Sequence, residues 1–212
     1  ALDHVALLQI GARNGQNHAF LRTVGQTGRP VLLKRHPGAT LNEWLLCAEH
    51  LLVAGCPSLI LCERGIRTFE HASRYTLDLA SVVLAKAQVP APIFVDPSHA
   101  AGAHALVIPL ALAAVAAGAD GILVETHTHP ERARSDAAQA LDAIQLASLA
   151  QQLGAVASAV GRSFTSPVNH DENTRSDRSG RLTDRGHDRR SDPVLGLQAT
   201  HGSYVDFDVS EP

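Results

Sequence analysis

The chain has 212 residues and a formal net charge of -3; 45% of its residues are hydrophobic and 18% are charged. This length suits one domain, with or without an appendage, and the composition excludes collagens, coiled coils and basic nucleic-acid-binding proteins. No apolar run reaches the length of about 18 residues that a membrane-spanning helix needs, and no signal peptide is recognisable at the N-terminus.

Five short apolar runs without polar alternation predict buried parallel strands. They are Val5–Ile10, Pro30–Leu33, Ser58–Cys62, Pro92–Val95 and Gly121–Val124. The stretches between and after them predict helices at Asn14–Val24, Thr40–Ala54, Leu106–Ala117 and Ala137–Val160. Thr40 and Glu43 have the spacing of a capping box, which marks the start of a helix. The repeated βα order predicts an α/β fold with right-handed crossovers, either a doubly wound sheet or part of a (β/α)8 barrel.

The composition changes after residue 160. Residues 161–212 are polar, with only scattered hydrophobic side chains, and such a segment cannot bury enough apolar surface to offset the entropy lost on ordering. We therefore expect a folded portion at 1–160 and a mostly disordered tail at 161–212. Acidic residues match the arginines of the tail, so no net positive field exists there to bind nucleic acid.

An ionisable residue follows each of the five predicted strands. The strand ends read Gly11-Ala12-Arg13-Asn14, Lys34-Arg35, Glu63-Arg64-Gly65-Ile66-Arg67, Asp96-Pro97-Ser98-His99 and Glu125-Thr126-His127. Because the carboxyl ends of barrel strands converge on one mouth, where substrates bind, five such ends in succession predict a functional site. No Gly-x-Gly-x-x-Gly or Walker loop follows any strand, which argues against a dinucleotide or a nucleoside triphosphate as ligand.

Three cations come from three adjacent strand ends. They are Arg13, Lys34 and Arg64, with Arg67 as a fourth candidate. Several fixed cations in one mouth favour a polyanionic ligand, and the planar guanidinium matches phosphate or carboxylate. A small phosphorylated acid fits this pattern. The alternative is that each cation pairs with a neighbouring carboxylate, for which Glu63 is the obvious candidate.

A second group of residues has the chemistry of a metal site. His99, Glu125 and Asp136 follow the fourth strand, the fifth strand and the next loop, and an imidazole with two carboxylates suits Mn, Fe, Co or Zn. Glu125 is the best evidence, because a carboxylate that closes a buried run must be paired or metal-bound. The alternatives are that His99 is a hydrogen-bonded loop histidine and that Asp136 is the N-cap of the following helix.

These segments also resemble, in order and almost without gaps, the signatures of one enzyme family. The matching stretches are Gln9-Ile10-Gly11-Ala12-Arg13-Asn14, Pro30-Val31-Leu32-Leu33-Lys34-Arg35, Leu61-Cys62-Glu63-Arg64-Gly65-Ile66-Arg67-Thr68-Phe69-Glu70, Val95-Asp96-Pro97-Ser98-His99, Glu125-Thr126-His127 and Ser135-Asp136. They resemble 3-deoxy-7-phosphoheptulonate synthase (DAHP synthase) of the type I-beta branch, which is related to KDO-8-phosphate synthase. The resemblance runs from about Val5 to Val160.

The resemblance implies a function and a set of site residues. It implies a partial (β/α)8 TIM barrel of five βα units, strands four to eight, and the condensation of phosphoenolpyruvate with erythrose 4-phosphate, the first step of the shikimate pathway and of aromatic amino acid biosynthesis. It implies a divalent metal (Mn, Fe, Co or Zn) and assembly as a homo-oligomer. The implied substrate-binding residues are Ala12, Arg13, Lys34, Glu63 and Arg64, the catalytic ones Lys34, Arg64 and His99, and the metal ligands His99, Glu125 and Asp136.

The chain also departs from the family pattern. The family's first three strands carry a cysteine metal ligand and a Lys-Pro-Arg-Thr-Ser-like loop that have no match here, and the chain contains no Met and begins with Ala1; we therefore expect its natural start upstream. Two alternatives stay open: a KDO-8-phosphate synthase-like enzyme that uses arabinose 5-phosphate, and a non-catalytic fragment that retains the phosphoenolpyruvate and metal half-site. Three cysteines in no metal-finger spacing favour a reducing, cytoplasmic location.

Overall fold

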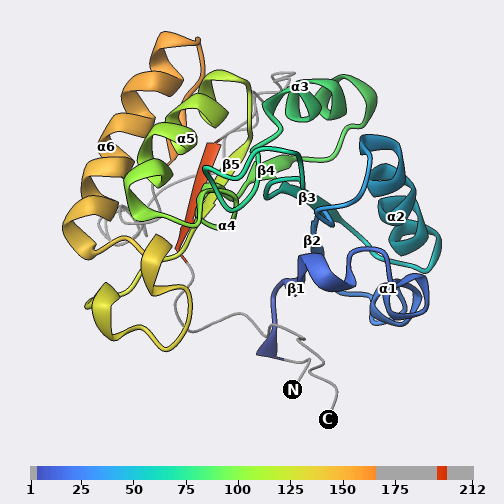
Figure 1. The fold of residues 1–212 in the computed structure, drawn as a ribbon. Coiled ribbons are helices and arrows are strands. Elements are labelled where there is room, and N and C mark those ends of the chain that lie inside the picture. The colour runs from blue at the N-terminus through green and yellow to red at the C-terminus, as the bar shows by residue number, and fades with distance from the viewer. Residues whose placement is uncertain (1–3, 166–194, 200–212) are drawn as a thin grey trace, which may run out of the picture.

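The predicted strands pair side by side, in chain order, as one parallel sheet. The computed structural model describes residues 4–165 and 195–199 of the chain (Figure 1). The order of the sheet is β1-β2-β3-β4-β5-β7-β6, and every neighbouring pair is parallel. The strands are β1 (Leu8–Ile10), β2 (Val31–Lys34), β3 (Leu59–Glu63), β4 (Ile93–Val95), β5 (Gly121–Val124), β6 (Phe164–Thr165) and β7 (Leu195–Ala199).

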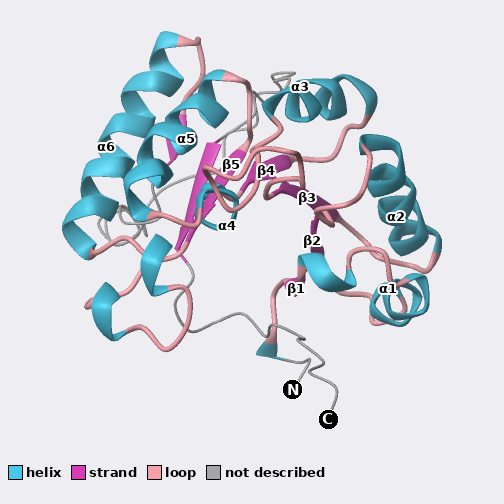
Figure 2. Ribbon diagram, viewed as in Figure 1, coloured by secondary structure: helices cyan, strands magenta, loops and turns pink. Residues whose placement is uncertain are grey.

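Helices connect the strands and lie along the outside of the sheet (Figure 2). They are α1 (His18–Gly25), α2 (Leu41–Val53), α3 (Leu79–Gln88), α4 (Pro97–Ala101), α5 (His104–Ala116) and α6 (Ala143–Ala159). This arrangement confirms the predicted α/β fold as part of a (β/α)8 barrel rather than a doubly wound sheet, because the helices pack on one face only. Within the described residues, no helix has the length and apolar character needed to cross a membrane.

Capping residues set where the helices begin. The predicted capping box is confirmed at α2, where the side chain of Glu43 accepts from the backbone N–H of Thr40 at 2.8 Å and Thr40 Oγ1 accepts from Glu43 N–H at 3.2 Å. The helix predicted from Ala137 starts later, because a second capping box formed by Asp142 and Gln145 opens α6. Residues Ala137–Gln139 form only a short 3-10 turn.

The period-two alternation of strand side chains divides the core into two layers. Leu33, Leu61 and Val95 face the helices and belong to one large buried cluster with the apolar faces of α1 to α6. The intervening side chains face the inside of the curved sheet and form a smaller cluster, which contains Leu32, Cys62, Phe94 and Leu123. By the same alternation, the residues two positions after these four also lie on the inner face, at the carboxyl ends of the strands. They are Lys34, Arg64, Asp96 and Glu125.

The segment predicted as a disordered tail contains two described strands. β7 pairs with β5, for example Ile122 with Leu197, and β6 pairs with β7. Before them, Arg162 donates to the carbonyl oxygen of Ala119 at 2.6 Å and forms an ion pair with Asp120 at 2.9 Å, which ties the end of α6 to the sheet. The prediction did not anticipate these strands. The rest of 166–212 lies outside the described residues, and there the disordered tail stays a prediction.

A glycine on the inner face provides a test of the packing. Gly121 of β5 is paired with Phe94 of β4, and a Cβ added at Gly121 would overlap three atoms of the Phe94 ring. We expect Gly121→Ala to lower the free energy of unfolding by about 1–3 kcal/mol, the usual cost of overpacking a core, as measured by urea denaturation.

The matched control is Gly154→Ala on α6, where the nearest side-chain atom would lie 3.6 Å from the new Cβ. Because Ala is the better helix former by about 1 kcal/mol, this variant should be as stable as the original protein or more so. Equal stability of the two variants would contradict the inner-face packing described above.

Candidate functional site

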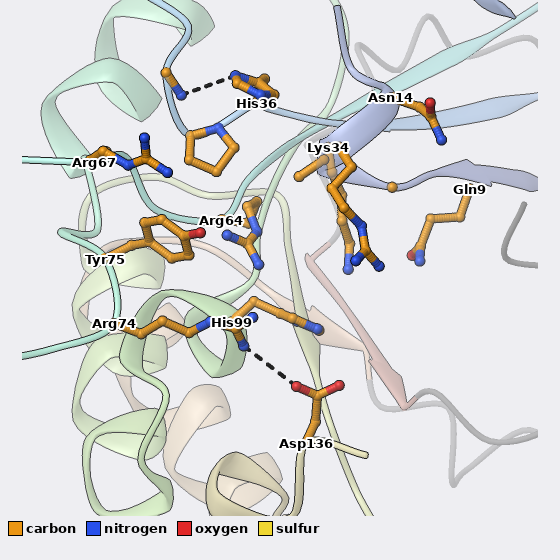
Figure 3. A pocket seen from close by; sticks show the side chains of 15 residues that line it. Gln9, Asn14, Lys34, His36, Arg64, Arg67, Arg74, Tyr75, His99 and Asp136 are labelled. Atoms are coloured by element: carbon orange, nitrogen blue, oxygen red, sulfur yellow. Dashed lines mark hydrogen bonds and ion pairs between the residues drawn. The ribbon is translucent and has the colours of Figure 1, made fainter. Parts of the chain in front are cut away.

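A cavity of about 420 Å3 opens at the carboxyl ends of the first four strands (Figure 3). Among the described residues, five cationic side chains and one carboxylate, that of Asp136, line it, so it suits an anionic ligand. Of the sequence-predicted site residues, Ala12, Arg13, Lys34, Arg64, Arg67, His99 and Asp136 line it. The other lining residues are Gln9, Gly11, Asn14, His36, Pro37, Gly38, Arg74 and Tyr75.

Arg13 reaches the cavity on a tight turn after β1. Residues Ala12–Asn14 form a single 3-10 turn, and Gly15 follows it against the end of β2. A Cβ at Gly15 would lie 2.8 Å from the carbonyl oxygen of Lys34, which is closer than side chains normally approach. The glycine therefore lets the turn that carries Arg13 pack directly beside Lys34.

Lys34, Asp96 and His99 form one chain of buried contacts. Lys34 Nζ lies 2.9 Å from Asp96 Oδ2, and the same oxygen lies 2.7 Å from His99 Nδ1. The other oxygen, Oδ1, accepts from the backbone N–H of His99 at 3.0 Å, so Asp96 is also the N-cap of α4. The carboxylate is 1% exposed. Because a buried charge without partners is strongly destabilising, Lys34 and His99 are needed to stabilise it.

Electrostatics keeps Asp96 and Lys34 charged. Burial by itself raises the pKa of Asp96, but Lys34 and His99 outweigh it and hold that pKa well below its usual value. Burial likewise lowers the pKa of Lys34, and the charge of Asp96 reverses this, so that the pKa of Lys34 is raised overall. Because an ionised carboxylate only accepts hydrogen bonds, His99 Nδ1 must donate to Asp96. In neutral His99 the lone pair then lies on Nε2.

The metal-ligand candidates are only partly assembled. His99 Nε2 lies 3.6 Å from Glu125 Oε1, and burial raises the pKa of Glu125, as expected for a carboxylate that a cation would stabilise. Asp136 instead forms an ion pair with Arg74 at 3.4 Å. No group of three potential ligands is assembled in the part of the chain that the structure describes. The donor chemistry of His99 and Glu125 fits a divalent metal, and Asp136 could join them by leaving Arg74.

The alternative for Asp136 as a helix N-cap is wrong. The long helix α6 is capped by Asp142, and the side chain of Asp136 makes no capping hydrogen bond to the short turn that follows it. Asp136 has a left-handed backbone with a φ of 56°. Such a conformation is unfavourable for most residues, and here it belongs to a loop that reaches the cavity.

Glu63 does not line the cavity, and its role as a substrate-binding residue stays a prediction. As the last residue of β3 it continues the helix-facing row of Leu61, and it is fully buried. It pairs with Arg35 at 3.0 Å, and its Oε1 accepts from the backbone N–H of Gly65 at 2.6 Å. Burial raises the pKa of Glu63, against the opposing effect of Arg35. The carboxylate thus supports the turn behind Arg64, and its partner is Arg35 rather than Arg67.

Arg64 is buried in the cavity wall, and no carboxylate of the described residues forms an ion pair with it. Arg64 is 6% exposed. Its Nε is buried, and the described residues provide no hydrogen-bond partner for it. The guanidinium carbon lies 4.8 Å from the centre of the Tyr75 ring. A buried N–H donor without an acceptor is costly, so the unpartnered Nε is consistent with a site that takes an anion.

Sequence reasoning missed three residues of the site. Asp96 stands in a strand-end segment but had no assigned role, although a carboxylate directly after a buried strand was the signal used for Glu125. Arg74 and Tyr75 lie in the loop between β3 and α3, and no sequence pattern places them beside Arg64.

Comparisons with known proteins agree on one family. The model of the DAHP synthetase I family matches residues 1–161. A phospho-2-dehydro-3-deoxyheptonate aldolase of Thermotoga maritima is 48% identical over 159 residues, covering 75% of this chain and 47% of that protein. A 2-dehydro-3-deoxyphosphooctonate aldolase of Dichelobacter nodosus is 32% identical over 174 residues, covering 73% of this chain and 60% of that protein. The chain thus spans about half to three fifths of these relatives' length.

A solved structure shows the same fold. A truncated form of 3-deoxy-D-arabino-heptulosonate 7-phosphate synthase from Thermotoga maritima superposes with a TM-score of 0.74 at 47% sequence identity. The superposition covers 76% of this chain and 62% of the other.

The lowered pKa of Asp96 predicts how stability changes with pH. A group whose pKa is lower in the folded state stabilises the fold above its unfolded pKa, about 3.9 for Asp, and loses this contribution as the pH falls toward the folded value. We expect Asp96→Asn to be less stable than the original protein by about 3–5 kcal/mol at pH 7, because it leaves Lys34 buried and unpaired.

The difference between the two proteins should shrink as the pH falls below about 4. The measurement is the urea midpoint of both proteins between pH 3 and pH 7. A stability difference that is constant over this range would contradict the assignment of a charged Asp96 in the folded state.

Proposed function

The chain belongs to the DAHP synthetase I family, and from this membership we propose that it forms the phosphoenolpyruvate and metal part of an enzyme that condenses phosphoenolpyruvate with erythrose 4-phosphate. The products are 3-deoxy-D-arabino-heptulosonate 7-phosphate and phosphate. The observation that carries the proposal is the convergence of Arg13, Lys34 and Arg64 on one cavity, with Arg64 Nε buried and unpartnered among the described residues.

Phosphoenolpyruvate fits the distribution of charge in the cavity. Its phosphate and its carboxylate are both attached to C2 of a small planar enol, and guanidinium groups bind such anions through paired N–H donors. Arg64 and Arg13 supply this geometry, Lys34 supplies a compact point charge, and the turn at Ala12 lines the same wall. Because Asp96 keeps the pKa of Lys34 raised, the ammonium stays charged at neutral pH.

The residues of the cavity then act on charge that develops during the reaction. C3 of phosphoenolpyruvate bonds to the aldehyde carbon of erythrose 4-phosphate, water adds at C2, and phosphate leaves from C2. Fixed cations near C2 stabilise the negative charge that develops on the departing phosphate. Lys34 lies in position to act as such a fixed cation, and it is also a candidate proton donor within this wall.

A divalent metal fits the proposal. His99 and Glu125 would hold it, with Asp136 as a third ligand once it leaves Arg74, and Mn, Fe, Co or Zn suit these donors. When bound, such an ion supplies a Lewis acid for the aldehyde carbonyl or its water. Asp96 fixes the ring of His99 so that Nε2 faces Glu125, which is the role of an outer partner of a metal-bound histidine.

Other features that the resemblance implies stay predictions. These are the place of the reaction in the shikimate pathway, assembly as a homo-oligomer and a cytoplasmic location.

The choice of substrates can be tested directly. The purified protein is incubated with phosphoenolpyruvate, Mn2+ and either erythrose 4-phosphate or arabinose 5-phosphate, and the release of phosphate is measured. We expect faster turnover with erythrose 4-phosphate. Faster turnover with arabinose 5-phosphate would establish the KDO-8-phosphate alternative, and binding of phosphoenolpyruvate without any turnover would favour the non-catalytic alternative.

Arg64 can be tested through phosphoenolpyruvate binding alone. Removal of one charged partner from a buried anion contact costs about 2–5 kcal/mol, so Arg64→Gln should weaken phosphoenolpyruvate binding by at least tenfold in isothermal titration calorimetry. The matched control is Arg22→Gln on the exposed side of α1, which should leave the affinity unchanged. Similar affinities for both variants would remove Arg64 from the anion site.

The metal ligands can be tested by metal content. His99→Ala should lose bound Mn2+ in an equilibrium titration followed by electron paramagnetic resonance, while its circular dichroism stays that of a folded protein. His104→Ala, at an exposed position at the start of α5, is the control and should bind Mn2+ as the original protein does. Unchanged Mn2+ binding by a folded His99→Ala protein would remove His99 from the ligand set.

A further inference from the structure

A buried arginine usually has a carboxylate beside it, but Arg64 has an aromatic ring. Its guanidinium carbon lies 4.8 Å from the centre of the Tyr75 ring, and no described residue provides a hydrogen-bond partner for its Nε. Arg35, which is also buried, shows the usual arrangement, since it pairs with Glu63 and Asp78 at 3.0 Å each. Only Arg64 of these two lines the cavity.

A second guanidinium approaches the same ring. The guanidinium carbon of Arg74 lies 5.8 Å from the Tyr75 centroid, and Arg74 also pairs with Asp136. Figure 3 shows the ring beside Arg64, with the side chain of Arg74 extending past it toward Asp136. Because the face of an aromatic ring is electronegative, it attracts both cations within about 6 Å.

The backbone fixes the position of this ring. The N–H groups of Tyr75 and Arg74 donate to the carbonyl oxygens of Ala100 and Ala101 at 2.8 and 3.2 Å, which attaches the loop to α4. On the other side, a Cβ at Gly65 would lie 2.6 Å from Tyr75 Cβ, so the residue after Arg64 must be small for the two segments to pack. The ring therefore keeps a constant position relative to both Arg64 and the helix that carries His99.

We propose that Tyr75 is a positioning residue for the anion site, holding the guanidinium of Arg64 toward the phosphorylated substrate without neutralising its charge. The inference rests on the function proposed above. A carboxylate in the same place would orient Arg64 equally well, but it would also occupy the N–H donors and cancel the charge. An aromatic face orients the guanidinium by its plane and leaves the edges, where the N–H donors lie, available to phosphate or carboxylate.

The ring, and not the hydroxyl, performs this role. The described residues provide no hydrogen bond to the hydroxyl of Tyr75, so Tyr75→Phe keeps the whole interaction, whereas Tyr75→Leu keeps most of the apolar volume and removes the electronegative face. The measurement is the dissociation constant of phosphoenolpyruvate in isothermal titration calorimetry. We expect Tyr75→Phe to stay within about twofold of the original protein and Tyr75→Leu to weaken binding by about 5- to 30-fold, the range for a desolvated cation–π contact.

Steady-state kinetics separates positioning from general damage. The KM for phosphoenolpyruvate should rise in Tyr75→Leu by a factor similar to that of the dissociation constant, with kcat changed by less than about threefold, since binding rather than the chemical step is affected. In an Arg64→Gln background, Tyr75→Leu should cause no further loss of affinity. An equal further loss there would show that Tyr75 does not act through Arg64.

A second variant controls for the integrity of the loop. Thr68 Oγ1 and Thr76 Oγ1 are hydrogen-bonded at 2.6 Å within the same loop, so Thr68→Val loosens the loop without touching the ring. It should leave phosphoenolpyruvate affinity unchanged. If Thr68→Val weakened phosphoenolpyruvate binding as much as Tyr75→Leu does, this inference alone would be overturned. The same holds if Tyr75→Leu left the affinity unchanged. Failure of the original protein to bind phosphoenolpyruvate would overturn the proposed function and this inference with it.

Discussion

The carboxylate of Asp96 lies between Lys34 and His99 with almost no exposure to solvent. It thereby joins the two halves of the site, the cations that face an anion and the imidazole that faces Glu125. Desolvation of three ionisable groups is costly, and the arrangement is stable only because each one is the partner of another. Movement of Asp96 would leave the buried ammonium of Lys34 without its ion-pair partner and the His99 ring without its Nδ1 contact. The relative placement of Lys34 and His99 is therefore fixed by the fold before any ligand binds.

The alternation of side chains along the strands explains why these groups meet. The inner row of the sheet is apolar at Leu32, Cys62 and Phe94, and two residues further on the same side come Lys34, Arg64 and Asp96. The apolar layer excludes water from the barrel interior next to these charges, which strengthens the ion pair between Lys34 and Asp96. In the neighbouring helix-facing row, Glu63 and Arg35 are paired with each other. Lys34 and Arg64 on the inner row line the cavity, whereas Glu63 and Arg35 on the outer row stabilise the connections.

Much of the fold could be predicted from the sequence because its signals are local. Apolar runs predict strands β1 to β5, and the Thr40–Glu43 capping box predicts the start of α2. Strand ends with ionisable residues located the site. Glu63 lies on the same side of β3 as Leu61, so the alternation along the strand predicts a helix-facing side chain there, whereas the resemblance implies a substrate-binding role. The late start of α6 was missed because Asp142 and Gln145 form a stronger helix start than Ser135-Asp136. Tyr75 was not predictable, since its contact with Arg64 depends on how a loop packs on α4.

Two kinds of support hold the two buried cations of the cavity wall. Asp96 supports Lys34 by charge, and Tyr75 supports Arg64 by its ring face. The first also determines the tautomer of His99, which can be measured by 15N NMR of the imidazole in metal-free protein at a pH where the ring is neutral. With Asp96 ionised, the proton should lie on Nδ1, and Nε2 should show the chemical shift of an unprotonated nitrogen. A proton on Nε2 would contradict the link between Lys34, Asp96 and His99 on which the site depends.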